Sequence, residues 1–199
     1  MEVSQNPLNR KQQIERTATS LFRTKGYAAT SMRDLAHELG IEAASLYSHI
    51  KSKEEILQRV CFRVAQEFFE ALDAAEANSG CATSRLKKAI AAHVRVLTQN
   101  TEASAVFLYE WRHLSEPMHS TYRNLRDRYE ARFRDMIREG TASDEFHVPD
   151  EKFAVLTILS ALNWIHTWYR PDGKMKPAEI AENISNMLLH GLSYPTQPH

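Results

Sequence analysis

Residues 30–57 read TSMRDLAHELGIEAASLYSHIKSKEEIL, and this stretch decides the fold. Its first part predicts a short helix over about 32–39, because apolar residues recur there at i, i+3, i+4 and i+7. Gly40 follows where the chain must turn, and a second short helix is expected over about 43–50. Two helices joined through a glycine-containing turn are typical of a helix-turn-helix motif, here residues 31–50, whose second helix enters the major groove of DNA.

The side chains of this motif suit contact with DNA. Small residues at the start of the second helix allow close approach to base edges. Hydroxyl, imidazole and ammonium groups around it suit phosphates, and Thr30 or Ser31 is expected to cap the first helix. The expected base-reading residues are Ala43, Ala44, Ser45 and His49; the expected phosphate ligands are Thr30, Tyr47, Lys51 and Lys53; Ser31 and Arg33 complete the predicted DNA-binding surface.

The same stretch resembles the DNA-binding domain of the tetracycline repressor (TetR) family. The family pattern T-x-x-x-I/L-A-x-x-x-G-V-S-x-x-x-L-Y-x-x-F-x-x-K-x-x-L is matched by Leu35, Ala36, Gly40, Ile41, Leu46, Tyr47, Ile50 and Lys53, with Thr30 and Leu57 one residue outside its first and last positions. Upstream, residues 18–27 match A-x-x-L-F-x-x-K-G-Y, so the resemblance covers about residues 8–57. It implies a regulator with a three-helix DNA-binding domain. Glu42 and the pair Ser48-His49 depart from the pattern, so the operator sequence does not follow from it.

The rest of the chain has helical periodicity, without a strand pattern or an internal repeat. We therefore predict an all-α fold of about nine helices. The N-terminal helix-turn-helix domain is expected at 8–53, a ligand-binding and dimerisation domain at 54–192, and a tail at 193–199. Further helices are expected over about 53–78, 102–114, 118–139, 150–169 and 176–192, and another is expected after the break at 78–80 and to end at about 99.

Composition fits a cytoplasmic regulator. The formal net charge is zero, but residues 1–53 carry eight Lys or Arg against five Asp or Glu, while the remainder carries 17 against 20. A basic head on an acidic body suits phosphate binding at one end. The N-terminus is polar rather than like a signal peptide, and no apolar run reaches membrane-spanning length. Cys61 and Cys81 have no metal or redox spacing, so free thiols are expected.

The predicted helix over 150–169 is apolar on more than one side. It is either a well-buried central helix or a helix that buries one side against another molecule. In the resembled family that molecule is a second subunit, which forms a four-helix interface. We therefore expect a homodimer, with an interface that includes Leu159, Leu162, Ile180, Ile184, Met187 and Leu188.

The sequence offers no positive case for an enzyme. Its nine histidines are scattered without H-x-x-x-H spacing, and it has neither a glycine-rich phosphate loop nor a nucleophile elbow. A lone His93 or His166 on an apolar helix is more often a hydrogen-bonded core residue than a ligand. We therefore expect no catalytic residue, no metal site and no cofactor.

A small-molecule site is indicated instead, because aromatic residues recur on three helices with a few polar groups among them. A core rich in aromatics, with arginines at its edge, is the alternative. Residues 163–173, NWIHTWYRPDG, also resemble the N-W-x-x-x-W-Y-x-P-x-G segment of a TetR subgroup tied to fatty-acid, aromatic and steroid catabolism, which implies an acyl-CoA effector. The expected ligand-binding residues are Phe107, Trp111, Arg112, Tyr122, Arg126, Asn163, Trp164 and Trp168.

These observations favour a dimeric repressor that an acyl-CoA or similar amphiphilic effector releases from a palindromic operator. Two alternatives stay open. One is a helical carrier or enzyme with a vestigial helix-turn-helix, for which the small-residue recognition helix and its basic flank would have no use. The other is a repressor that senses metal or redox state through Cys61, Cys81 or histidines.

Overall fold

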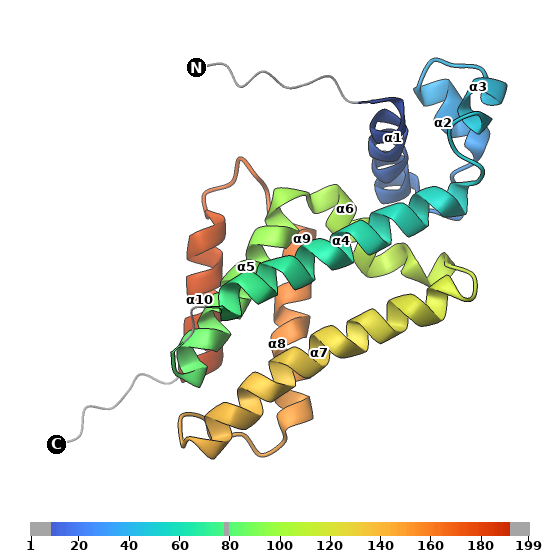
Figure 1. Ribbon diagram of the computed structural model, residues 1–199. Helices are drawn as coiled ribbons and strands as arrows, with labels where there is room; N and C mark the ends of the chain where they lie inside the picture. The colour runs from blue at the N-terminus through green and yellow to red at the C-terminus, as the bar shows by residue number, and fades with distance from the viewer. Residues whose placement is uncertain (1–8, 78–79, 192–199) are drawn as a thin grey trace. The chain divides into compact units, whose positions relative to one another are not determined.

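A computed structural model describes residues 9–77 and 80–191, in which ten α-helices, one short 3-10 helix and no strand are found (Figure 1). This confirms the all-α prediction. The described residues divide into two compact units, the first made of 9–64 with 102–122 and the second of 65–101 with 123–191. The functional boundary predicted at residue 53 stays a prediction.

The first unit opens with the predicted helix-turn-helix. Ser31, and not Thr30, caps the helix that begins at Met32. The Ser31 hydroxyl accepts from the backbone N–H of Asp34, and the Asp34 carboxylate accepts in return from the Ser31 N–H. This reciprocal capping box satisfies two otherwise unpaired donors. The three helices, coloured in blues in Figure 1, are α1 (Arg10–Lys25), α2 (Met32–Glu38) and α3 (Ala43–Tyr47).

The turn between α2 and α3 depends on Gly40. Its φ of +63° lies in the left-handed region, which a side chain disfavours. Helix α3 is shorter than expected and ends at Tyr47 rather than Ile50. The Ser48 hydroxyl donates to the Ser45 carbonyl, and the His49 N–H bonds three residues back to Leu46, so the backbone leaves the α-helical pattern there.

The first unit also contains segments from later in the chain, which are the start of α4 (Lys53–Glu76), α6 (Thr101–Tyr109), the 3-10 helix η1 (Glu110–His113) and the start of α7 (Met118–Ala142). Its core holds the predicted apolar faces of the DNA-binding helices. Fully buried members are Ile14, Ala18, Leu35, Leu46, Ile56, Leu57 and Val60.

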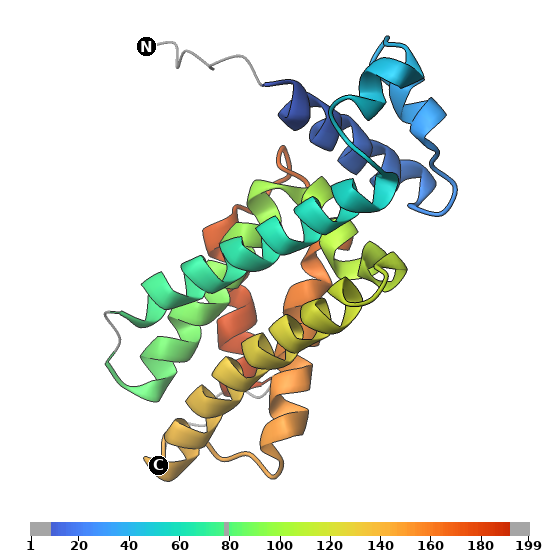
Figure 2. The ribbon, with the colours of Figure 1, turned by 45° about the vertical axis from the view of Figure 1, so that its right-hand side comes forward.

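The helices of the second unit are α5 (Ala82–Gln99), α8 (Glu151–Asn163), α9 (Ile165–Trp168) and α10 (Pro177–His190), with the ends of α4 and α7. Helix α5 contacts α8, α9 and α10, and α5 and α10 lie side by side in Figure 2. Along α5, Leu86, Ile90 and Leu97 are buried with the neighbouring His93.

The prediction of a single helix over 150–169 is wrong in one respect, because the chain forms two helices there, with a break at Trp164. The His166 ring donates from Nδ1 to the Asn163 carbonyl at 2.5 Å. The Thr167 N–H therefore bonds to the Trp164 carbonyl instead, three residues back, which makes one tighter turn.

A carboxylate from the loop after α7 caps the start of α5. Glu145 accepts from the backbone N–H groups of Ala82 and Thr83, each at 2.9 Å. Cys81, the N-cap residue, makes no side-chain capping bond to the helix backbone. The hydrogen bonds to Thr83 and Ala82 lower the pKa of Glu145 to about 2, as expected for a carboxylate that accepts several donors at a helix N-terminus.

Within residues 9–77 and 80–191, every helix is too short or too polar to span a lipid bilayer.

Candidate nucleic-acid interface and effector site

The start of α2 and the length of α3 present small and polar side chains to solvent. Tyr47 is the largest of them, with 53 % of its surface exposed. Ala43 and His49 are partly exposed, whereas Leu46 between them is fully buried and anchors the helix. The exposed candidates for DNA contact are Ser31, Arg33, Ala44, Ser45, Tyr47 and Lys51.

Two of the predicted phosphate ligands face inward instead. Thr30 is 1 % exposed, and its hydroxyl donates to the Gly26 carbonyl at 2.8 Å. Lys53 donates from Nζ to the carbonyls of Tyr27 and Thr30, both at 2.7 Å. The prediction of phosphate contact is therefore corrected for Thr30 and Lys53: both fasten the loop between α1 and α2, and Lys53 ties that loop to the start of α4.

The environment of Lys53 explains this inward position. Its ammonium lies 4.1 Å from the centre of the Tyr27 ring, a cation–π geometry. Burial lowers the Lys53 pKa, and Glu110 acts against that shift. Burial also raises the pKa of Tyr27.

Segments 102–122 are tied to the DNA-binding helices inside the first unit. The His113 ring stacks on Tyr27 with ring centres 5.1 Å apart. The Glu54 carboxylate accepts from the backbone N–H of Ser115 at 2.7 Å and from its hydroxyl at 3.1 Å. The hydrogen bonds from Ser115 lower the Glu54 pKa. The end of η1 thus contacts both the loop before α2 and the start of α4.

Three predicted effector residues meet in an aromatic cluster at this same segment. Trp111 and Tyr122 stack with ring centres 5.3 Å apart, and Phe107 meets Tyr122 edge-on at 5.4 Å. The Tyr122 hydroxyl donates to the Phe107 carbonyl at 2.6 Å. The His119 ring also stacks on Trp111, with ring centres 5.2 Å apart. The three aromatic residues named from sequence are therefore brought together.

The other predicted effector residues are placed differently. Arg112 is exposed, with its guanidinium 5.1 Å from the centre of the Trp111 ring, so it lies at the edge of the aromatic cluster. Arg126 is exposed on α7. Trp164 and Trp168 expose 62 % and 42 % of their surface, and their role in binding the effector stays a prediction.

A buried polar pair in the second unit was missed as a candidate site. His93 Nδ1 lies 3.1 Å from the hydroxyl of Tyr129, and Asn163, a predicted effector residue, interacts with the same histidine. Phe68 packs on the His93 ring, with ring centres 4.6 Å apart. The apolar spacing of α5 predicts a core histidine correctly, but an unpaired nitrogen cannot be read from spacing.

The predicted dimer residues divide into two groups. Leu162 and Ile180 are 0 % and 1 % exposed within their own unit, so their assignment to a subunit surface is corrected: they are core residues of the chain itself. Leu159, Ile184 and Leu188 are partly exposed and Met187 is 52 % exposed. Helix α8 also exposes Phe153 and Leu156, at 72 % and 44 %, which the predicted interface did not include.

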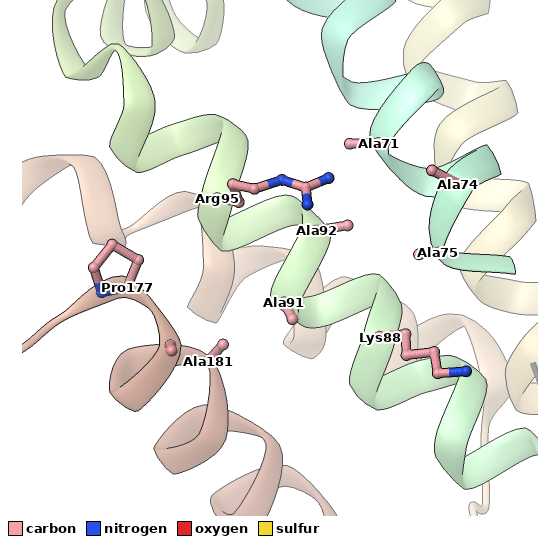
Figure 3. Close-up of a pocket in the computed structure, with 10 residues that line it drawn as sticks. Ala71, Ala74, Ala75, Lys88, Ala91, Ala92, Arg95, Pro177 and Ala181 are labelled. Atoms are coloured by element: carbon pink, nitrogen blue, oxygen red, sulfur yellow. The ribbon is translucent and has the colours of Figure 1, made fainter. Parts of the chain in front are cut away.

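Two hollows of the second unit have a mostly apolar lining. One, of about 590 Å³, is lined by residues of the loop after α7 and of α5, α8 and α10, among them Leu86, Phe153 and Leu188. The other, of about 470 Å³, is a groove floored by alanines of α4, α5 and α10 (Figure 3). Its charged lining residues, Lys88 and Arg95, are exposed, so no buried polar group in it selects a ligand.

Two family models match the chain. Residues 14–60 match the model for bacterial regulatory proteins of the tetR family, and residues 79–192 match the tetracyclin repressor-like C-terminal domain. The chain belongs to the TetR family. The resemblance identified from residues 8–57 is therefore confirmed and extends over most of the chain.

Two solved structures and one curated repressor are similar to the chain over nearly their whole length. The TetR-family regulator PfmR from Thermus thermophilus is 34 % identical, with a TM-score of 0.82, and the match covers 92 % of this chain and 100 % of PfmR. AibR, solved in complex with isovaleryl coenzyme A and operator DNA, is 22 % identical, with a TM-score of 0.80 and coverage of 91 % and 98 %. The repressor KstR2 of Mycolicibacterium smegmatis is 21 % identical over 194 residues, 96 % of this chain and 95 % of KstR2.

As a TetR-family member the protein is a ligand-responsive transcriptional regulator that binds operator DNA, and not an enzyme. Among the described residues, no group of three His, Cys, Asp or Glu is placed to hold a metal ion. Cys61 is buried, and burial raises the pKa of its thiol to about 12, which disfavours the thiolate that redox sensing requires. Cys81 is exposed.

Proposed function

We propose that the protein is a homodimeric repressor that binds a palindromic operator through α3 and is released from it by an acyl-CoA thioester. The single observation that carries the release mechanism is that His113 of η1 stacks on Tyr27, in the loop before α2, inside one compact unit. The proposal has three parts, which are DNA recognition, dimerisation and effector coupling.

DNA recognition is assigned to the exposed side chains of α3 and its flanks. Ala44 and Ser45 are small enough for the helix to approach base edges, and the Ser45 hydroxyl can donate to or accept from a base. Tyr47 and Lys51 are exposed and suited to phosphate oxygens. Specific binding by such proteins typically has a Kd of order 10⁻⁸ to 10⁻¹¹ M.

Dimerisation is assigned to the exposed apolar side chains of α8 and α10. Phe153, Leu156 and Met187 together present more apolar surface than isolated exposed residues of a monomer need. A second copy that brings the same two helices would cover all of them, since a two-fold interface uses the same patch on both subunits. A dimer also places two copies of α3 to read the two halves of a palindrome.

The effector is assigned to the acyl-CoA class. The TetR subgroup segment at residues 163–173 supports this class, and AibR demonstrates that the fold can hold a CoA thioester together with operator DNA. The aromatic cluster of Phe107, Trp111 and Tyr122 suits an apolar acyl chain. Arg112 at its edge suits a phosphate, because guanidinium binds phosphate oxygens in a bidentate manner.

Coupling is assigned to the short path from the aromatic cluster to α3. A ligand that displaces Trp111 moves η1, whose His113 stacks on Tyr27. Ser115, two residues after η1, is bonded to Glu54. Tyr27 and Glu54 flank the loop and the helix that hold α2 and α3 in place. An effector that weakens DNA binding tenfold needs only about 1.4 kcal/mol of differential affinity between the two conformations.

The test is a two-stage binding experiment. Operator duplexes are first selected from random-sequence DNA by retention on the full-length protein. Release from the selected duplex is then titrated with a panel of CoA thioesters, the corresponding free acids, free CoA, and divalent metals. Release by thioesters alone supports the proposal. Release by free acids or metals, with no effect of thioesters, would overturn the assigned effector class and leave the regulator itself.

A further inference from the structure

The second unit holds a polar pair enclosed by aromatic rings. His93 on α5 is 3 % exposed, and its ring lies near those of Phe68 and Phe133, with ring centres 4.6 and 6.5 Å away. Tyr129 on α7 lies between Phe69 and Phe133, at 5.5 Å from each. A hydrogen-bonding group placed in such apolar surroundings is costly to leave unpaired, because it has given up its bonds to water.

One nitrogen of His93 is left without a partner. Nδ1 is paired with the Tyr129 hydroxyl at 3.1 Å, whereas Nε2 is buried and has no hydrogen-bond partner among the described residues. Asn163 is the other polar side chain that interacts with His93, and it does not satisfy Nε2. A phenylalanine would fill the same space but would leave the Tyr129 hydroxyl without this partner, so the histidine pairs with Tyr129 through Nδ1 and keeps a second polar nitrogen, Nε2, buried.

The hydrogen-bond pattern identifies the proton on the unpaired nitrogen. If the Tyr129 hydroxyl donates to Nδ1, the neutral ring carries its proton on Nε2 and one buried donor is left over. If Nδ1–H donates to the tyrosine oxygen instead, Nε2 lacks a donor and the tyrosine O–H also lacks an acceptor. The first arrangement leaves fewer unpaired groups, so the free group is an Nε2–H donor.

The site selects against charge. Burial lowers the pKa of His93 to about 3, with Asn163 acting in the opposite direction, so the ring is neutral at physiological pH. Burial likewise raises the pKa of Tyr129. An anionic carboxylate or phosphate would lose its hydration here without gaining an opposite charge. The partner for a lone neutral N–H among aromatic rings is a neutral acceptor oxygen on an apolar skeleton.

A nearby hollow shares the two helix faces that carry this pair. Leu86, two turns before His93 on α5, and Ile137, one turn after Phe133 on α7, both line the hollow of about 590 Å³. Part of the wall of the hollow therefore belongs to α5 and α7, the two helices that carry His93 and Tyr129.

We infer that His93, held by Tyr129, is a specificity-determining residue that donates a hydrogen bond from Nε2 to a neutral keto or hydroxyl oxygen on an apolar ligand bound within the second unit, with the Asn163 amide beside it. This rests on the proposed function insofar as it assumes that the protein binds a small molecule. It goes further by naming a chemical group that a ligand of the second unit carries. Ligands with this oxygen bind more tightly than the same skeleton without it.

The first test uses the intact, ligand-free protein. Long-range ¹H–¹⁵N NMR of the histidine side chains distinguishes an Nε2–H from an Nδ1–H ring. The His93 signal is assigned by its loss in His93→Phe, or by its shift in Tyr129→Phe if the first variant does not fold. We expect a neutral Nε2–H ring that stays neutral down to pH 5. A ring protonated on Nδ1, or charged at pH 7, would overturn the inference.

The second test compares oxygen with carbon at constant shape. Cyclohexanone should shift the His93 Nε2–H resonance at millimolar concentration, and methylenecyclohexane, in which CH₂ replaces the oxygen, should not. In matched acyl-CoA pairs, a keto or hydroxy thioester should bind roughly tenfold more tightly than the unsubstituted one. His93→Phe should abolish this preference, whereas Phe133→Leu should weaken both members equally.

These outcomes separate the two proposals. A ketone that shifts Nε2–H while no thioester releases DNA would refute the acyl-CoA class and leave the His93 site intact. Thioesters that release DNA without any preference for the keto or hydroxy form, and a ketone without effect on the resonance, would refute the His93 site and leave the effector class intact.

Discussion

The imidazole of His113, at the end of η1, stacks on the phenol ring of Tyr27, with ring centres 5.1 Å apart and 26° between their planes. Tyr27 lies in the loop before α2, and two of its groups are also held by Lys53: the carbonyl by a hydrogen bond of 2.7 Å and the ring by a cation–π contact. A segment carrying the aromatic cluster is thus joined to the loop that positions the recognition helix.

His113→Ala should uncouple effector binding from DNA release. The stack is lost, whereas the exposed residues of α3 are untouched, so operator affinity without effector should change by less than about threefold. The effector-induced loss of affinity should fall from roughly tenfold or more to less than about threefold. The measurement is the operator Kd with and without saturating effector. Lys174→Ala, in the exposed turn before α10, is the control and should behave like wild type. Full release in His113→Ala would refute the coupling path.

Lys51 and Lys53 should differ in the salt dependence of DNA binding. Lys51 is exposed, and its replacement by Ala should remove one phosphate contact per subunit, which lowers the slope of log K against log salt by about 2 for a dimer. Lys53→Ala should leave the slope unchanged, because its ammonium is bonded to the carbonyls of Tyr27 and Thr30. It should instead cost about 1–3 kcal/mol of stability. Titrations of operator DNA at several salt concentrations measure both slopes. A slope that is reduced in Lys53→Ala but not in Lys51→Ala would mean that Lys53, and not Lys51, contacts phosphate.

Phe153→Glu should dissociate the dimer. Phe153 is 72 % exposed in one chain, and a second copy seated on α8 and α10 would bury it. A carboxylate buried there without a partner costs about 3 kcal/mol or more, so dimer affinity should fall at least roughly 100-fold. Analytical ultracentrifugation measures the change. Lys174→Glu, in the exposed turn before α10, should leave the dimer intact, and a wild-type protein that sediments as a monomer at micromolar concentration would contradict the proposed interface.

Glu145→Gln should destabilise the second unit in a manner that depends on pH. The folded-state pKa of Glu145 is about 2, below the ordinary value of 4.5, because the carboxylate accepts from Thr83 and Ala82. A depressed pKa means that its contribution to stability is fully present above pH 4.5 and is lost as pH falls towards 2. Thermal unfolding should show the variant less stable than wild type at pH 7, with the gap closing between pH 4.5 and 2. The control is Glu182→Gln, at an exposed position of α10. A stability difference between variant and wild type that does not vary with pH would refute the capping role.

The fold was predictable because its signals are local. The apolar spacing around Leu35 and Leu46, and the glycine between them, depend on contacts within a few residues of sequence. The break at Trp164 was not predictable, since it depends on a histidine side chain that competes for a backbone carbonyl.

The candidate sites were predictable only in part. Lysine and threonine near a recognition helix suit phosphates, but Lys53 and Thr30 find backbone carbonyls as partners, and sequence spacing does not reveal where such carbonyls lie. Leu162 and Ile180 have the apolar character of interface residues, yet the fold turns them inward while leaving Phe153 outside. His93 could be assigned to the core, but its unpaired nitrogen emerges only once α5 and α7 are packed.

The most direct measurement of effector-controlled DNA binding is fluorescence anisotropy of a labelled, selected operator duplex bound to the full-length dimer and titrated with acyl-CoA thioesters. We expect nanomolar binding without effector, and at least roughly tenfold weaker binding in the presence of a thioester that carries a keto or hydroxyl oxygen. Operator affinity that stays constant across all thioesters, at concentrations where calorimetry shows that they bind the protein, would contradict release by this class of effector.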